Sequence, residues 1–378
     1  MKNYINVKTW IHFIETACLI FFLIATQGCT IKKGLSVSRV NPSMGRHVQE
    51  VLDAAVAEFK VPGAILAVRD MDGNTRFWTS GVANLKTGKP MSKDLYFRIG
   101  SVTKSYTSTV ILQLVDEGRI ILDDPIGKYM PGLVPLDGEI TIQNLLEMRS
   151  GLGSYGTNEE FAKLLEAKQD RVWTPEELIR LSSFINAKPG GDFDYNNANY
   201  ILMGMLIEKV TNESYESQVI KRIFQPLGMS HTSFPVTMQM PAPFAHGYLF
   251  WDGKVVDGTD SIHPSAAWSA GSIISTADDQ LIWAKALVEG RMLSPQIQAK
   301  RFKMSPMINK PGMYGLGVLN VYGIVGHGGN YNNAYTSFVG RHRGYDCVIL
   351  VNGKTGDTKS GDFGALNIIQ KLIEEAGL

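Results

Sequence analysis

The sequence predicts an α+β fold, in which one antiparallel sheet flanked by helices lies beside a mostly helical lobe. An apolar run at 64–68, a turn at Asp72-Gly73 and a β-rich run at 75–78 have the pattern of a hairpin. Residues 120–245 are mostly helical in pattern, and short β-rich runs return after residue 313. We therefore expect a sheet built from both ends of the chain, with a site in the cleft between the two lobes.

Composition sets the class of protein. The chain has 378 residues, of which 44% are apolar and 19% charged, as in a soluble globular protein. Lys+Arg is 37 and Asp+Glu is 36, so the net charge of +1 provides no electrostatic footprint for nucleic acid or for an anionic membrane. Three cysteines (Cys18, Cys29 and Cys347) are too few for a disulfide framework or a cysteine-based zinc site, and the seven histidines show no ligand spacing.

The first residues resemble an export signal. An apolar run from Ala17 to Thr26 is shorter than the about 20 residues needed to span a bilayer, and it fits the core of a signal peptide. Gly28-Cys29 directly follows this core and resembles a lipoprotein cleavage site. We expect residues 1–28 to be a signal peptide, Cys29 to carry a lipid, and residues 29–43 to form a tether. The alternative is an ordinary secretory signal, which also exports the protein to the periplasm or cell surface.

The exported part begins with a helix at 44–60, followed by the hairpin and by a helix at 101–117 that stops at Gly118. We assign the sheet lobe to about 44–118 and 246–378, and the helical lobe to about 119–245. The further helices that we expect are Ile142–Met148, Pro175–Phe184, Asn199–Val210, Tyr215–Phe224 and 361–376. The later strands are Tyr314–Leu319, Gly323–Val325, Tyr335–Val339 and Cys347–Val351.

Ser101 and Lys104 are the candidate nucleophile and base. Residues i and i+3 share one face of a helix, so the lysine amine can reach the serine hydroxyl. Burial and the positive end of the helix dipole both lower the pKa of such a lysine, and a neutral amine can activate a serine. The N-terminus of the helix also offers N–H groups to a developing oxyanion. The motif alone also fits a capped surface helix.

Two further motifs follow. Tyr195 and Asn197 come after a Pro-Gly-Gly loop; the phenol can relay a proton, and the amide can orient both the lysine and a substrate. His327-Gly328-Gly329 lies in a β-rich run, where glycine marks a close backbone approach. A substrate could bond to this strand, with the N–H of Asn330 and that of Ser101 as the two oxyanion donors. Each motif alone also fits an ordinary loop.

Together and in this order, the motifs resemble those of the serine β-lactamase and penicillin-binding protein superfamily, in its class C β-lactamase-like and D-Ala-D-Ala carboxypeptidase branch. That family carries S-x-x-K, Y-x-N and K/H-x-G. The segments FRIGSVTK (97–104), PGGDFDYNNANYILMG (189–204) and AGSIISTADD (270–279) resemble family segments as well. The resemblance extends from about residue 44 to the C-terminus and implies the β-lactamase/transpeptidase-like fold.

The resemblance also implies a mechanism. Ser101 attacks a carbonyl, Lys104 and Tyr195 move protons, Asn197 orients the lysine and the substrate amide, and water releases the acyl group. No cofactor or metal is implied. We expect a monomer whose partner is a small-molecule, peptide or ester substrate, such as a peptidoglycan stem peptide or a β-lactam. Contact with a membrane is expected only through the lipid anchor.

The third motif departs from the family pattern. Where relatives have Thr or Ser, a hydroxyl helps to bind a substrate carboxylate, and Gly328 has none. His-Gly-Gly resembles the broader β-lactamase-related hydrolases, so a short-chain esterase or D-amino-acid peptidase is the alternative to a carboxypeptidase. A transpeptidase and a non-catalytic binding lipoprotein of the cell envelope also remain open.

Overall fold

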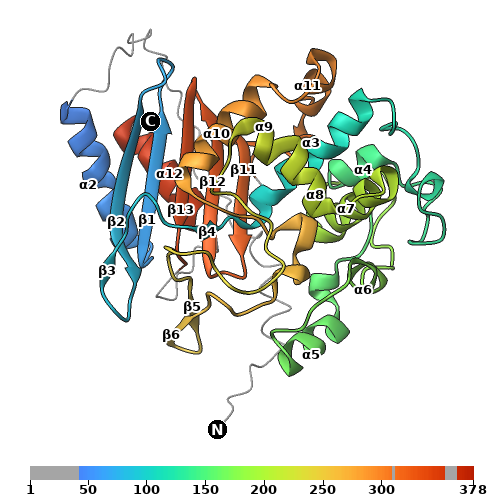
Figure 1. The fold of residues 1–378 in the computed structure, drawn as a ribbon, viewed down its shortest axis with the longest axis horizontal. Helices are drawn as coiled ribbons and strands as arrows, with labels where there is room; N and C mark the ends of the chain where they lie inside the picture. The colour runs from blue at the N-terminus through green and yellow to red at the C-terminus, as the bar shows by residue number, and fades with distance from the viewer. Residues whose placement is uncertain (1–41, 309–310, 354–363) are drawn as a thin grey trace.

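The computed structural model describes residues 42–308, 311–353 and 364–378. Its centre is a nine-stranded antiparallel sheet with the order β3-β2-β1-β13-β12-β11-β10-β9-β8 (Figure 1). The strands are β1 (Gly63–Arg69), β2 (Thr75–Asn84), β3 (Lys89–Pro90), β8 (Ser305–Pro306), β9 (Met313–Tyr314), β10 (Leu319–Val321), β11 (Ile324–Tyr331), β12 (Tyr335–His342) and β13 (Tyr345–Val351). The expectation of one sheet built from both ends of the chain is confirmed.

The two ends of the chain meet in the middle of the sheet. β1 pairs with β13 from Ala64↔Val351 to Arg69↔Asp346, and with β2 on its other edge. The β1–β2 turn is the predicted one: Gly73 has φ +88°, and the N–H groups of Asp72 and Asn74 donate to the Asp70 carboxylate. All residues of β1 from Gly63 to Val68 are buried, so both faces of this strand are covered.

Helices cover both faces of the sheet. On the outer face lie α2 (Pro42–Glu58) and α12 (Gly364–Ala376), whose apolar stripes pack on the outward side chains of the central strands (Figure 1). The inner face is covered by α10 (Ala277–Glu289) and joins the larger core cluster. A two-stranded pair, β4 (Phe97–Arg98) with β7 (Ile274–Ser275), connects the sheet to the nucleophile candidate.

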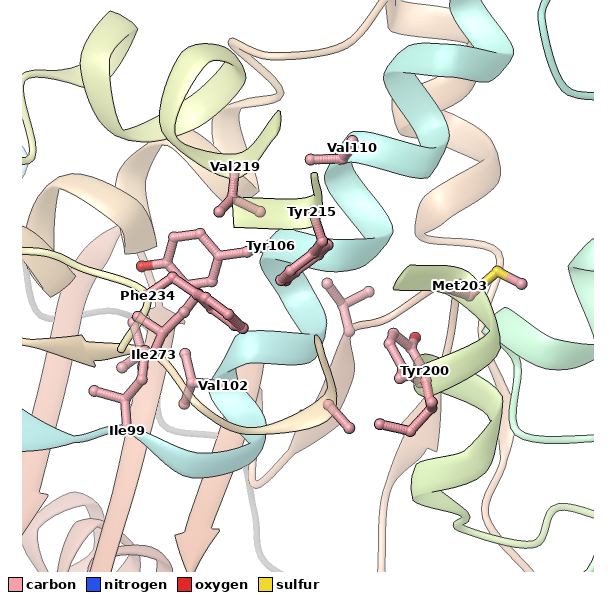
Figure 2. Packing of buried hydrophobic residues seen from close by; sticks show 14 of the residues in the cluster. Ile99, Val102, Tyr106, Val110, Tyr200, Met203, Tyr215, Val219, Phe234 and Ile273 are labelled. Atoms are coloured by element: carbon pink, nitrogen blue, oxygen red, sulfur yellow. The ribbon is translucent and has the colours of Figure 1, made fainter. Parts of the chain in front are cut away.

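The helical part lies beside the sheet, on the right in Figure 1. Its central helix is α3 (Thr103–Asp116), which carries Tyr106 and passes between Val219 on one side and Tyr200 and Met203 on the other (Figure 2). The surrounding helices are α4 (Ile142–Leu146), α5 (Glu159–Ala167), α6 (Pro175–Arg180), α7 (Asn197–Thr211), α8 (Tyr215–Val219) with a π turn at Ile220–Phe224, α9 (Gln225–Leu227) and α11 (Pro295–Arg301). A hairpin of β5 (Tyr248–Trp251) and β6 (Lys254–Asp257) completes the described elements.

Several element boundaries differ from the sequence-based expectation, three of them by more than a few residues or by an interruption. The predicted strand Tyr314–Leu319 is wrong: it is interrupted by a tight turn, in which Gly317 has φ +74° and the N–H of Gly315 bonds to Val318. The strand expected at Gly323–Val325 runs instead to Tyr331, through the glycine pair. The helix expected at Pro175–Phe184 begins with a capping box formed by Thr174 and Glu177, as a helix start should, but it ends at Arg180.

The predicted signal peptide, Cys29 and most of the tether lie outside the described residues. Within the described part of the chain, no helix has the length and apolar character needed to cross a membrane.

Candidate active site

Ser101 and Lys104 meet as their spacing predicts. Ser101 lies in a 3-10 turn, Gly100–Val102, that leads directly into α3, so the α-helix begins two residues later than expected. The Nζ of Lys104 is 2.9 Å from the Oγ of Ser101. Ser101 is partly exposed whereas Lys104 is fully buried, so the hydroxyl is accessible and the amine is not.

The surroundings of Lys104 favour the neutral amine. Its Nζ also lies 2.7 Å from Oδ1 of Asn197 and 2.8 Å from the Ala270 carbonyl oxygen. Burial without a carboxylate partner moves the pKa of Lys104 well below its usual 10.5. A neutral amine has two N–H groups and one lone pair. Since the Oδ1 of Asn197 and the Ala270 carbonyl oxygen can only accept, the lone pair is left for the hydroxyl of Ser101.

Asn197 begins α7, and Asn196 caps that helix by accepting from the Ala198 N–H. The hydroxyl of Tyr155, whose pKa burial raises, interacts with Asn197 and donates to the Ala266 carbonyl at 2.9 Å. The Oδ1 of Asn197 is directed at Lys104. The ring of Tyr195 lies with its centroid 4.9 Å from the Lys104 amine, so the second motif reaches the first.

The glycines of the third motif let β11 approach the nucleophile turn. A Cβ placed on Gly329 would be 1.9 Å from the Ile99 carbonyl oxygen, which itself accepts from the Ser337 hydroxyl. Gly100 has φ +53°, and a Cβ there would be 2.6 Å from the Asn330 carbonyl carbon. Larger residues at either position would separate the strand from Ser101.

Strand register places the backbone of Asn330 on the open edge of β11. The β10–β11 hairpin turns through Tyr322 and Gly323, both at positive φ, so Val321 and Ile324 form its closing hydrogen-bonded pair. Backbone groups alternate along a strand, so those of Gly328 and Asn330 point away from β12. β10 pairs with β11 only as far as Gly326, so no described strand covers this edge. The N–H of Asn330 is therefore available beside Ser101.

His327 uses both ring nitrogens inside the protein. Nδ1 is 2.6 Å from the Gly328 carbonyl oxygen, which can only accept, so this nitrogen carries the proton. Nε2 then accepts from the Tyr314 hydroxyl at 3.1 Å. Burial lowers the pKa of His327 to about 3. The ring is consequently a neutral structural element and not a cation.

The β-lactamase family model matches residues 48–369. The chain belongs to the β-lactamase family. Its members among the similar proteins include serine hydrolases, and the three motifs occupy one site here as the family pattern requires. In the described residues, no three His, Cys, Asp or Glu side chains come together as a metal site would need.

Similar proteins within the β-lactamase family carry several names. Penicillin-binding protein 4 of Amycolatopsis lactamdurans is 30% identical over 63% of this chain and 62% of its own length. Protein flp of Staphylococcus aureus is 28% identical over 83% of this chain and 64% of its own length. The chain thus spans less than two thirds of the curated relatives that it matches.

Solved structures of the same fold match over nearly their whole length. A D-stereospecific amidohydrolase from Streptomyces sp. is 32% identical, with a TM-score of 0.77 over 88% of this chain and 99% of that one. The D-amino acid amidase from Ochrobactrum anthropi SV3, complexed with L-phenylalanine amide, is 29% identical, with a TM-score of 0.78 over 88% and 98%. The β-lactamase/transpeptidase-like α+β fold is thereby confirmed.

Arg341 does not serve the β-lactamase-family site as a substitute cation, although it lies on the neighbouring strand. Arg341 pairs with Val325 at the start of β11, whereas Gly328 and Asn330 lie further along that strand. Its guanidinium is 2.7 Å from the Asp346 carboxylate and 3.2 Å from that of Glu289. Arg341 is therefore held by two acidic groups, away from the Gly328–Asn330 edge.

Sequence reasoning missed the Ala270 carbonyl, the third partner of Lys104. A backbone carbonyl has no residue signature, and segment 270–279 entered only as a resemblance. One signal was present: the segment 103–109 is rich in hydroxyl residues such as Thr103 and Thr107 although it precedes an apolar face, and in the structure both of these residues bond to segment 268–273. Tyr314, the partner of His327, was assigned only to a strand.

Proposed function

We propose that this β-lactamase-family serine hydrolase works through an acyl-enzyme and cleaves amide or ester bonds. The observation that carries the proposal is the buried Lys104, whose two acceptors leave its lone pair for Ser101. Burial provides the neutral base, and geometry provides its direction. The non-catalytic lipoprotein alternative explains neither feature.

In the proposed reaction, Lys104 takes the proton of Ser101 while Oγ bonds to the substrate carbonyl carbon. The N–H groups of Ser101 and Asn330 are the proposed oxyanion donors, because Asn330 lies on the open edge of β11 and its backbone packs against Gly100, the residue before Ser101. Tyr195, beside Lys104, passes the proton to the leaving group, so the amine or alcohol departs neutral. Water then attacks the acyl-enzyme, and Ser101 regains its proton as the acid leaves.

For the substrate, we propose small amides or esters of D-amino acids in preference to β-lactams. A carboxylate-bearing substrate needs a cation or hydroxyl at the third motif, but His327 is neutral, Gly328 has no side chain and Arg341 is paired. A charge-assisted hydrogen bond contributes about 1.5–3 kcal/mol, so its absence costs roughly tenfold or more in kcat/KM. The similar structures named as D-stereospecific amidohydrolase and D-amino acid amidase support the same class.

The test is kcat/KM on one preparation for D-phenylalanine amide, its L-enantiomer, an aryl acetate, a D-Ala-D-Ala peptide and a chromogenic cephalosporin. We expect the D-amide or the aryl acetate to lead. A cephalosporin value well above the others would overturn the proposal in favour of a true β-lactamase. A kcat/KM for the D-Ala-D-Ala peptide above those of the other substrates would favour the carboxypeptidase function instead. Adding an amine acceptor separates hydrolysis from transpeptidation, because only a transpeptidase forms the aminolysis product.

Gly328→Thr sharpens the substrate argument. A Cβ at this position would meet the ring of Phe338 at 3.3 Å, a contact that a small ring movement relieves. The new hydroxyl should raise kcat/KM for the D-Ala-D-Ala peptide relative to the D-amide by up to the roughly tenfold that one such bond provides. An unchanged ratio would show that the missing hydroxyl does not set specificity.

We also propose that the protein is exported and lipid-anchored through Cys29, on the basis of the apolar core and the Gly28-Cys29 junction. Wild-type protein should partition into detergent after processing. Cys29→Ser should give a soluble exported form or an unprocessed precursor. Processed wild-type protein found wholly in the aqueous phase would refute the anchor while leaving export open.

A further inference from the structure

A backbone segment, residues 268–273, runs between α3 and α7, and we call it the strap. Side chains of α3 hold one side of it. Lys104 donates to the Ala270 carbonyl at 2.8 Å, and the Thr107 hydroxyl donates to the Ser269 carbonyl at 2.6 Å. The Thr103 hydroxyl accepts from the Ile273 N–H at 3.2 Å. Successive backbone groups of the strap thus satisfy the polar face of the buried helix.

The other side of the strap rests on α7 at Gly204. A Cβ on Gly204 would lie 2.3 Å from Oγ of Ser269, 2.6 Å from its Cβ and 2.7 Å from Cζ3 of Trp268. The Ser269 hydroxyl also donates to the Tyr200 carbonyl of α7 at 2.8 Å. No side chain larger than hydrogen fits between the helix and the strap at this point.

The strap holds an unfavourable backbone conformation where it meets α7. Trp268 has φ +35°, a value that bulky residues rarely adopt. Its ring packs 5.5 Å from that of Tyr215, centroid to centroid, and the following turn, Trp268–Ala270, ends at the carbonyl that meets Lys104. Such a conformation persists only where the surroundings impose it, and here they are α3 on one side and α7 on the other.

We propose that Gly204 is a positioning residue for the general base, acting through the strap. By allowing α7 to touch residues 268 and 269, it places the Ala270 carbonyl at the Lys104 amine. That carbonyl and Asn197 occupy the two N–H groups of the amine, so the lone pair faces Ser101. The inference rests on the proposed function, because it concerns the orientation of the proposed base.

Gly204→Ala is the direct test. The added methyl group must displace the strap, and the Ala270 carbonyl moves with it. We expect kcat and the rate of Ser101 acylation by a fluorophosphonate to fall at least tenfold, with little change in KM. Gly45→Ala is the matched control: it makes the same change on α2, where the nearest heavy atom outside the helix is 3.8 Å away, and should leave both parameters unchanged.

The double variant Gly204→Ala/Ser269→Gly provides a partial rescue, because it removes both Ser269 atoms that clash and keeps the contact with Cζ3 of Trp268. The fall in kcat caused by Gly204→Ala should be much smaller in the Ser269→Gly background than the tenfold fall expected in the wild-type background. Equal losses in the two backgrounds would contradict the steric route. So would a folded Gly204→Ala variant with wild-type kcat.

A second variant keeps the inference testable if Gly204→Ala does not fold. Thr107→Val preserves the shape of the side chain but releases the Ser269 carbonyl from α3. It should lower kcat with little change in KM, whereas an unchanged kcat would show that the strap does not position the base. Failure of the wild-type protein to label at Ser101 would instead overturn the proposed function itself, so the two failures are distinguishable.

Discussion

Helix α3, at the centre of the helical part, and helix α12, on the outer face of the sheet, are buried in different ways. α12 buries one stripe, formed by Ala365, Ile368, Ile369, Leu372 and Ala376, at ordinary helical spacing. α3 is buried on all sides from Thr103 to Leu112, although most of its first turns are polar. Apolar contact with the sheet and with α2 provides most of the packing of α12, whereas the buried polar groups of α3 depend on hydrogen bonds.

The hydroxyls of α3 show how those bonds are distributed. Ser105 accepts from the indole of Trp283 at 2.8 Å, and Thr109 accepts from the buried Arg301 at 2.6 Å. Thr107 and Lys104 bond to the strap. Substitutions in α12 should therefore change stability alone, whereas removing Lys104 from α3, or Ser101 from the turn before it, should change chemistry. Measurements on Ser101, Lys104 and Leu372 test this contrast, and one on His327 concerns stability in acid.

The largest effect is expected for Ser101→Ala, which should abolish covalent labelling by a fluorophosphonate because the nucleophilic oxygen is gone. Ser108→Ala is the control: its buried hydroxyl bonds only to the Ser105 carbonyl of the same helix, so labelling should persist. Mass spectrometry of the labelled protein gives the answer. Full labelling of Ser101→Ala would remove this residue from the mechanism.

Lys104→Ala should lower the acylation rate by about 10²–10⁴-fold, the usual contribution of general acid–base catalysis. Lys104→Met keeps the length of the chain without the amine and should lose a similar factor. Stopped-flow acylation by an activated ester measures both. Loss of less than about tenfold in the two variants would mean that another group takes the Ser101 proton.

Leu372→Ala on α12 should give the opposite result. Removing a fully buried leucine costs about 2–5 kcal/mol of unfolding free energy, because it leaves a cavity under the outer face of the sheet. Urea denaturation measures that loss, while kcat/KM of the folded variant should match the wild type. A marked change in kcat/KM would show that the outer layer communicates with the site.

The last prediction concerns the contribution of His327 to acid sensitivity, which should leave activity at neutral pH least affected. Its pKa is lowered from 6.5 to about 3 by burial, so between these values the unfolded chain binds a proton that the folded chain does not. Stability therefore falls as pH drops through this window, by up to about 1.4 kcal/mol per pH unit. His327→Gln should flatten the dependence of unfolding free energy on pH from 6.5 to 4. Parallel wild-type and variant curves would contradict the neutral, buried ring.

The sequence was informative where one side chain and one spacing carried the signal. The i, i+3 relation brought Ser101 to Lys104, and the residues after the Pro-Gly-Gly loop brought Asn197 to the same amine. The apolar stripe of α12 and the turn at Gly73 were predicted for the same reason.

Features that depend on tertiary surroundings could not be predicted. β11 runs through Gly328 and Gly329, which have low strand propensity, because its partner β12 and the turn at Ser101 fix its path. The neutral state of His327 follows from burial and from Tyr314 thirteen residues earlier in the chain. The Ala270 carbonyl is a main-chain atom, so no residue type marks it.

The pairing of β1 with β13 also has a consequence for the order of folding. During synthesis, the apolar β1–β2 hairpin emerges long before Tyr345–Val351, the strand that closes its free edge. Until then the hairpin exposes unpaired backbone groups and an uncovered core face, which are features that promote aggregation. The sheet can form only once nearly the whole chain is available, so folding should be slow and dominated by distant contacts. A chain truncated before residue 345 should accumulate as insoluble protein.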